Sequence, residues 1–343
     1  MKKFFVILFC VAIHLISCGK NNDNPVPPDT IVNKTGFAKG ADISWLTEME
    51  AAGYKFYNRA GEQKDCYALL KEQGMNAVRL RAWVNPADGW CNTADMVGKA
   101  KRAKAAGMAI MLDLHYSDSW ADPGKQNKPV AWSSLNFNDL KNALYEYTKH
   151  VMDTLKSNGV VPSWVQVGNE TNDGMLWEDG RASKNMGNFA TLVKAGYDAV
   201  KSVSDTTKVI VHLSNGFDNS LFVWMFDGLK NNGAKWDVIG MSIYATASNW
   251  QSLNEQCLGN INFMISHYKT PVMICEVGMP WTDSVACKSF LTDLITKTKS
   301  VANNNGLGVF YWEPEAYNNW KSYTLGAFDN NGKPTIALDA FKE

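Results

Sequence analysis

Eight short apolar segments, each rich in β-branched or aromatic residues, recur along the chain and are separated by longer segments with helical spacing. The predicted strands are residues 41–45, 77–83, 109–115, 164–169, 208–213, 238–244, 272–276 and 308–312. The helical segments 96–106 and 140–155 are followed by Gly107 and Gly159, as expected of helix C-caps. Eight alternating units predict an α/β protein with a single (β/α)₈ TIM barrel.

The alternative fold is an open, doubly wound sheet. Such a sheet carries a glycine-rich turn after its first strand to bind a nucleotide, and no such turn follows residues 41–45. About 300 residues remain after the N-terminal segment described below, which is an ordinary length for one barrel. We therefore predict one domain without internal repeats.

Two of the predicted strands end in glutamates. Residues 165–170 end at Glu170 and residues 272–276 end at Glu276, and both runs are followed at once by turn-forming residues. The C-terminal ends of parallel barrel strands open on one face, so the two carboxyl groups can share a cleft. Hydrolysis of a glycosidic bond needs such a pair. The alternative for either glutamate alone is a salt bridge at a strand end.

Two arginines lie on the second predicted strand. Arg79 and Arg81 share one face because side chains alternate with a period of two. A buried arginine needs an anionic partner. We expect Arg81, which is nearer the C-terminal end of the strand, to keep a catalytic carboxylate ionised; an ion pair that serves only the fold is the alternative.

The third predicted strand ends in a dense cluster of polar and aromatic residues that includes His115, Asp118 and Trp120. A barrel places its functional site at these strand ends. A lone histidine is more often a hydrogen-bonded core residue, but Asp118 and Trp120 beside His115 favour contact with a sugar.

Other strand ends supply further candidates. Asn169 and Glu170 are adjacent, so regular pleating would point them in opposite directions unless the strand end is irregular, for example through a bulge. Tyr244 is expected to donate a hydrogen bond to the glutamate of the seventh strand. Trp281 and Trp312 are predicted to contact the sugar, and core packing is the alternative for each aromatic residue.

The overall charge argues against nucleic acid as a partner. The chain has 34 basic and 34 acidic side chains and a formal net charge of zero, so no basic excess attracts a phosphate backbone. Its 13 tryptophans offer flat apolar faces that suit the C–H surfaces of sugar rings, although many of them will belong to the core.

The N-terminus predicts export. Lys2 and Lys3 precede an apolar run, residues 4–16, that is too short to cross a bilayer, so residues 1–17 are predicted to be a signal peptide. Residues 15–18 resemble the lipobox of bacterial lipoproteins, which implies lipid attachment to Cys18; an ordinary cleavage site is the alternative. Residues 18–36 read as a polar, flexible tether that holds a barrel of residues 37–343 to a bacterial outer membrane, at the cell surface.

The remaining five cysteines include at least one free thiol by parity. Disulfides between Cys66 and Cys91 and between Cys257 and Cys287 are possible in an exported protein, although the sequence does not fix the pairing. Cys275 precedes the glutamate of the seventh strand, so we expect it to face the helices as a buried thiol.

Six motifs occur in order from about residue 36 to the C-terminus. They are Gly-Ala-Asp at 40–42, Arg-Leu-Arg-Ala-Trp-Val-Asn-Pro at 79–86, Leu-Asp-Leu-His-Tyr-Ser-Asp at 112–118, Trp-Ala-Asp-Pro-Gly-Lys-Gln at 120–126, Gln-Val-Gly-Asn-Glu at 166–170 and Tyr-Trp-Glu-Pro at 311–314. This ordered set resembles glycoside hydrolase family 53 of clan A, the endo-β-1,4-galactanases.

The resemblance implies a (β/α)₈ barrel that cleaves internal β-1,4 bonds in the galactan and arabinogalactan side chains of pectin, with galactan and galacto-oligosaccharides as partners. Cleavage would proceed with retention, with Glu170 as acid/base and Glu276 as nucleophile. It also implies a sugar site lined by Arg81, His115, Asn169, Tyr244 and Trp312. Two departures matter. Residues 245–250 lack the aromatic run that often follows the sixth strand in this family, and residues 245–255 and 277–288 have few acids for the Ca²⁺ of some bacterial members. We predict no metal, no cofactor and a monomer.

Two other functions compete with this one. Another clan A endo-glycanase, a mannanase or a xylanase, would share Asn169, Glu170 and the seventh-strand glutamate but not the Asp-Pro-Gly-Lys-Gln stretch. A non-catalytic surface glycan-binding protein would keep the tryptophans but would need neither glutamate.

Overall fold

The computed structural model describes residue 1 and residues 36–343. Within this part of the chain, eight parallel strands pair in sequence order, and β1 closes the barrel against β8. The strands are β1 (Ala38–Asp42), β2 (Ala77–Ala82), β3 (Ala109–Leu114), β4 (Trp164–Val167), β5 (Lys208–Leu213), β6 (Val238–Tyr244), β7 (Val272–Gly278) and β8 (Gly306–Trp312). The predicted (β/α)₈ barrel is confirmed.

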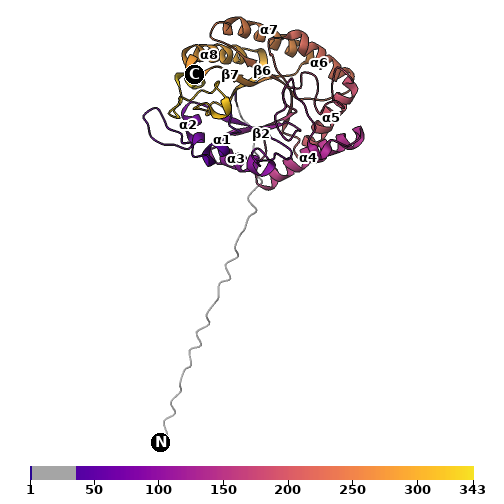
Figure 1. Cartoon of the computed structure of the whole chain (residues 1–343), viewed down its shortest axis with the longest axis horizontal. Helices are drawn as coiled ribbons and strands as arrows, with labels where there is room; N and C mark the ends of the chain where they lie inside the picture. The colour runs from indigo at the N-terminus through magenta and orange to yellow at the C-terminus, as the bar shows by residue number, and fades with distance from the viewer. Residues whose placement is uncertain (2–35) are drawn as a thin grey trace. The chain divides into compact units, whose positions relative to one another are not determined.

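Helices follow the strands and surround them (Figure 1). They are α1 (Leu46–Ala51), α2 (Cys66–Glu72), α3 (Thr93–Ala105), α4 (Phe137–Ser157), α5 (Met186–Val203), α6 (Asn219–Asn231), α7 (Trp250–Tyr268) and α8 (Ser284–Lys299). Short 3₁₀ helices are η1 (Val130–Trp132), η2 (Trp281–Asp283), η3 (Ala302–Asn304), η4 (Trp320–Ser322) and η5 (Ile336–Lys342). The first connection holds two helices, α1 and α2, and η5 packs against α8 after the last strand.

Side-chain caps set where several helices begin. Asn92 at the start of α3 and Asn136 at the start of α4 each accept a hydrogen bond from the backbone N–H three residues later, at 2.9 and 3.1 Å. Glycines end the same helices: Gly107 and Gly159 have φ of +69° and +72°, which confirms the predicted C-caps.

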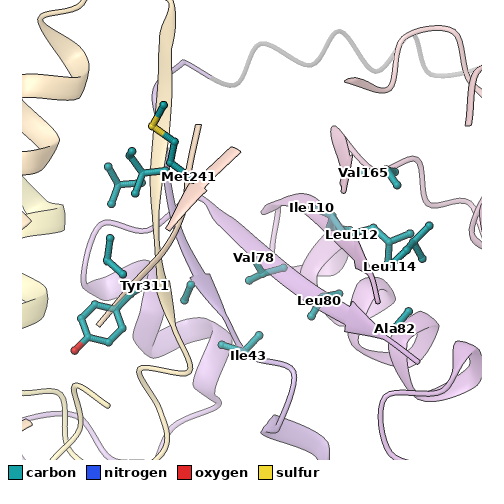
Figure 2. Packing of buried hydrophobic residues seen from close by; sticks show 14 of the residues in the cluster. Ile43, Val78, Leu80, Ala82, Ile110, Leu112, Leu114, Val165, Met241 and Tyr311 are labelled. Atoms are coloured by element: carbon teal, nitrogen blue, oxygen red, sulfur yellow. The ribbon is translucent and has the colours of Figure 1, made fainter. Parts of the chain in front are cut away.

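The strands separate two apolar layers. Side chains such as Val78, Leu80 and Leu112 point outward and pack with the helices (Figure 2). Residues on the other face fill the barrel, where Trp164 from β4 meets Phe310 from β8 with ring centroids 6.3 Å apart. The barrel is therefore a packed core at its N-terminal end, and its polar residues gather toward the C-terminal ends of the strands.

Two details of the strands differ from the predictions. β1 begins and ends three residues earlier than predicted, because the chain turns after Asp42, whose carboxylate accepts a hydrogen bond from the backbone N–H of Ser44 at 3.0 Å. β4 ends at Val167, because Gly168 then adopts a left-handed conformation with φ of +87°.

The cysteine predictions are wrong in two respects. Among the described residues Cys66, Cys91, Cys257 and Cys287 are all buried and free, so neither disulfide is present. Cys275 points into the barrel and not toward the helices, for a reason given below.

The predicted signal peptide, Cys18 lipidation and most of the tether lie outside the described residues. Among the helices that the structure does describe, none has the length and apolar character needed to span a bilayer.

Candidate active site

A cleft of about 390 Å³ opens at the C-terminal ends of the strands. Its walls come from the C-terminal ends of β6, β7 and β8 and from the segments that follow β1, β3, β4 and β8. The lining residues are Trp45, His115, Trp120, Ala121, Asp122, Asn169, Glu170, Tyr244, Glu276, Trp312, Lys321, Ser322 and Tyr323. Both predicted glutamates and five predicted sugar contacts therefore meet in one place.

The irregular end of β4 brings two adjacent side chains into this cleft. Gly168 and Glu170 both have positive φ, +87° and +44°, so the chain does not keep the alternation of a strand. As a result Asn169 and Glu170 both line the cleft. The backbone N–H of Thr171 then donates to the carbonyl of His212 at 2.8 Å, which ties this turn to β5. The predicted irregularity is present, although it is a left-handed turn and not a bulge.

A β-bulge places Glu276. Met241 of β6 pairs with Ile274, but the next residue, Ser242, pairs with Glu276, so Cys275 is an extra residue in β7. The bulge interrupts the alternation, and both Cys275 and Glu276 point into the barrel. Strict pleating had predicted that Cys275 faces the helices.

Arg79 is the cation that holds Glu276. Its Nη2 lies 2.7 Å from Oε1 of Glu276 and 2.9 Å from Asp113, and its Nη1 lies 2.7 Å from Asp42. The hydroxyl of Tyr244 donates to the other oxygen of Glu276 at 3.0 Å, as predicted. Glu276 thus receives a hydrogen bond at each carboxylate oxygen, which favours its anionic form.

The prediction that Arg81 serves a catalytic carboxylate is wrong. Arg81 is buried on the same face as Arg79, but its guanidinium contacts Glu313 at 3.2 Å and does not line the cleft. Two further predicted sugar contacts also lie outside the lining. Asp118 accepts hydrogen bonds from the backbone N–H groups of Asn85 and Val130, and the backbone of Trp281 is bonded to the segment after β8.

His115 is held as a neutral imidazole. Its Nδ1 accepts hydrogen bonds from the Trp83 indole at 3.3 Å and from the Ala121 backbone at 3.1 Å. The proton therefore sits on Nε2, which donates to Asp113 at 2.8 Å. Burial lowers the pKa of His115, and the Asp113 carboxylate only partly opposes this effect.

Asn169 is oriented by three neighbours. Its amide oxygen accepts from Arg79 at 2.8 Å and lies 3.1 Å from Nδ1 of His212, and its amide nitrogen donates to the carbonyl of Ala121 at 2.8 Å. His212 also lies 2.8 Å from the hydroxyl of Ser242. Sequence reasoning missed His212 and Ser242, although both fall on predicted strands where an interior polar residue could have been noticed.

Four aromatic residues form one side of the cleft, which we call the aromatic wall: Trp45, Trp120, Trp312 and Tyr323. Their rings meet edge to face, with centroid distances of 5.1 Å between Trp45 and Trp312 and 4.8 Å between Trp312 and Tyr323. Sequence reasoning missed Trp45 because it was assigned to a strand. Tyr323 lies eleven residues after the end of β8, and no sequence pattern predicted that it lines the cleft.

The two glutamates titrate as a pair. Burial raises the pKa of Glu170. Burial also raises the pKa of Glu276, against the opposing effect of Arg79, and the charge of Glu170 raises it further. Carboxyl groups that interact in this way release their protons as a pair and not independently. The hydrogen bonds from Arg79 and Tyr244 favour Glu276 as the anionic member of the pair.

Residues 36–343 contain no group of three or more His, Cys, Asp or Glu side chains placed to hold a metal ion. Three acidic groups at the site, Asp42, Asp113 and Glu276, pair with Arg79.

A closed (β/α)₈ barrel with a paired-glutamate cleft and an aromatic wall defines a glycoside hydrolase. Comparison with known proteins makes this more specific. The model of the family described as "Glycosyl hydrolase family 53" matches residues 38–341, so the chain belongs to this family, as its motifs indicated.

Individual relatives agree. A protein of Neosartorya fischeri named "Probable arabinogalactan endo-beta-1,4-galactanase A" is 37% identical over 298 residues, which cover 80% of this chain and 83% of that protein. A protein of Cellvibrio japonicus named "Arabinogalactan endo-beta-1,4-galactanase" is 36% identical over 315 residues, covering 83% of this chain and 82% of that one.

Solved structures share the whole barrel. A structure titled as one of two fungal beta-1,4-galactanases has a TM-score of 0.83 at 30% identity, and the match covers 90% of this chain and 99% of that one. A xylanase from Cellvibrio japonicus has a TM-score of 0.65 at 14% identity, over 89% of this chain and 66% of that one. The second likeness shows the fold alone.

Proposed function

We propose that this glycoside hydrolase is an endo-acting β-1,4-galactanase that cleaves internal bonds of the galactan side chains of pectin. The observation that carries the proposal is the pair of Glu170 and Glu276 in one cleft lined by the aromatic wall. The substrate is supported by relatives named as arabinogalactan endo-beta-1,4-galactanases at 36 and 37% identity.

The proposed mechanism is a double displacement with retention. Glu276, held as an anion by Arg79 and Tyr244, attacks the anomeric carbon, while Glu170 protonates the departing glycosidic oxygen. The first step forms a covalent galactosyl ester on Glu276. Glu170, now a carboxylate, then takes a proton from the water that hydrolyses this ester. Both glutamates thereby return to their starting protonation states.

Other residues of the site have supporting roles in this proposal. The neutral His115 fixes the Asp113 carboxylate through Nε2, so Asp113 remains available to Arg79. Asn169, oriented by Arg79 and Ala121, offers its amide to a sugar hydroxyl beside the reacting carbon. The aromatic wall supplies an apolar surface for the C–H face of the sugar rings.

The substrate is tested by incubating the protein with galactan, mannan and xylan side by side and measuring released reducing ends. We expect a ladder of galacto-oligosaccharides from galactan and little product from the other two. Preferred cleavage of mannan or xylan would support the other clan A activities. Binding of galactan without product would support a glycan-binding protein.

Replacing Glu170 by Gln is expected to lower kcat on galactan by about 10²- to 10⁴-fold, because the leaving oxygen loses its proton donor. Burial raises the pKa of Glu170, so wild-type activity should be present below that pKa and fall as the pH rises through it. The residual activity of the variant on galactan should lack this alkaline limb. On an aryl galactoside, whose leaving group needs no proton, the variant should form the covalent intermediate at a rate closer to that of the wild type.

A matched control for this variant is Glu178→Gln, on the same β4–α5 connection. The Glu178 side chain is 54% exposed and pairs with Lys184 and Arg181 at the surface. The Glu178→Gln variant should have the kcat and the pH profile of the wild type. An unchanged alkaline limb in the Glu170 variant would assign the proton donor to another group.

Export, lipidation of Cys18 and a monomeric state are parts of the same proposal that rest on the sequence. A Cys18→Ala variant expressed in a bacterial host should leave the membrane fraction if Cys18 carries the lipid. Membrane association that persists in this variant would contradict the anchor.

A further inference from the structure

Arg81 is a fully buried cation that plays no part in holding the two reacting glutamates. Its guanidinium carbon lies 4.2, 5.0 and 5.8 Å from the ring centroids of Trp120, Trp83 and Trp45. Within residues 36–343 its one carboxylate contact is Glu313, at 3.2 Å. Two of these three rings, those of Trp45 and Trp120, belong to the aromatic wall, so the cation lies directly behind that surface.

Glu313 connects this cation to the backbone that carries the wall. It follows Trp312 at the end of β8, has φ of +46° and is completely buried. Its Oε1 contacts Arg81, and its Oε2 accepts a hydrogen bond from the backbone N–H of Trp45 at 3.0 Å. One carboxylate, placed directly after Trp312 at the end of β8, thus joins Arg81 of β2 to the segment after β1 that carries Trp45.

A second buried glutamate, Glu315, lies next to Glu313. It is also completely buried, and no other residue within 36–343 donates a hydrogen bond to its carboxyl oxygens. Burial, and next the charge of the neighbouring Glu313, raise the pKa of Glu315 well above its ordinary value. We infer that Glu315 is the protonated member of the pair. The neutral acid therefore donates to Glu313, which keeps the single negative charge that Arg81 requires.

Other charged or titratable groups surround this pair. Asp42 from β1, Cys66 from α2, Cys91 before α3 and Tyr323 after β8 all face it, and Arg81 is the cation among them. Arg79 already pairs with Asp42. A second anion here would therefore leave the Arg81 guanidinium to balance both Glu313 and Glu315, which explains why one proton is retained.

We propose that Arg81, Glu313 and Glu315 are positioning residues that fix the aromatic wall and thereby set the affinity of the cleft for the sugar chain, an inference that rests on the proposed galactanase function. The guanidinium face holds the tryptophan rings through cation–π contacts. Glu313 fixes the direction of that guanidinium, and the proton of Glu315 keeps Glu313 singly charged and hydrogen-bonded. None of the three lines the cleft.

The first test replaces Arg81 by Met, which keeps much of the volume and removes the charge. We expect KM for galactan to rise about tenfold or more and kcat to change by less than about threefold, because the wall loosens while Glu170 and Glu276 keep their partners. A fall in kcat at unchanged KM would place Arg81 in the chemical step. Unchanged KM and kcat would also overturn the proposal.

A second readout does not depend on the substrate. The rings of Trp45, Trp120 and Trp312 lie within 5.8 Å of one another by centroid, so they should give a near-ultraviolet circular dichroism signal that depends on their packing. Arg81→Met should weaken this signal in the free protein. If the wild type fails to cleave galactan, the proposed function fails, but this signal still tests the positioning role.

A pair of Glu315 variants covers the case in which Arg81→Met does not fold. Glu315→Gln keeps a donor for Glu313, whereas Glu315→Leu removes it and is nearly the same size. The Gln variant should keep KM within about threefold of the wild type, and the Leu variant should raise it by about fivefold or more, since only the second leaves Glu313 without its donor. Equal KM values for the two variants would contradict a role for the Glu315 proton.

Discussion

Replacing Glu276 by Gln is expected to lower kcat on galactan by about 10⁴- to 10⁶-fold, because the amide cannot form the ester intermediate. The side chain keeps its shape, and its amide oxygen can still accept the hydrogen bond from Arg79. The fold should therefore survive, and thermal unfolding should remain cooperative. Steady-state kinetics on galactan, with single-turnover measurements for the slow variant, give the size of the effect.

The matched control for this variant is Glu255→Gln on α7. The Glu255 side chain is 68% exposed and pairs only at the surface with Lys297, so its loss should leave kcat unchanged. A second check uses Glu276→Gly with added azide, which can take the place of the missing carboxylate and should restore turnover as the α-galactosyl azide. Near-normal activity of the Gln variant would refute the assignment of Glu276.

Replacing Arg79 by Met is expected to lower the free energy of unfolding by about 3–5 kcal/mol, because it leaves a cluster of buried carboxylates without their cation. Arg79 is 1% exposed and pairs with Asp42, Asp113 and Glu276 at 2.7 to 2.9 Å. Activity should be lost as well, since Glu276 would take up a proton. Urea unfolding at neutral pH measures the first effect.

A surface arginine provides the comparison. Arg59 pairs with Asp339 and is 40% exposed, so Arg59→Met should cost about 1 kcal/mol or less. The Arg79 variant should also recover part of its stability at low pH, where its unpaired carboxyl groups become protonated. Equal stability losses in the two arginine variants would show that Arg79 does not carry the buried network.

For the two arginines of β2, the sequence predicted the face of the strand but not the partner of each side chain. A period of two correctly placed Arg79 and Arg81 on the inner face of the strand. Which of the two arginines contacts Glu276 depends on the distance that each side chain must span across the closed barrel. The alternation of residues along one strand does not give this distance. Choosing the arginine nearest the C-terminal end of the strand gave the wrong residue. Arg79 lies two residues earlier on β2, and its side chain still reaches Glu276.

The barrel itself was predictable because eight alternating segments and their glycine C-caps are local signals. The bulge at Cys275 was not, since an extra residue in β7 appears only against its neighbour β6. Tyr323 and Lys321 reach the cleft from an irregular segment after β8. This segment has no hydrophobic periodicity, so their positions could not be predicted from the sequence. Asp118 and Trp281 were placed near strand ends correctly, but their contacts hold loops together.

The central claim is that Glu276 forms a covalent bond to the sugar while Glu170 faces it as the proton donor. It is tested most directly by incubating the protein with a 2-deoxy-2-fluoro-β-galactobioside that bears a good leaving group, followed by mass spectrometry of the digested protein. We predict a single added fluorogalactobiosyl group, on Glu276. A label on another residue, or an active enzyme that releases the α-anomer first and takes up no label, would contradict this account.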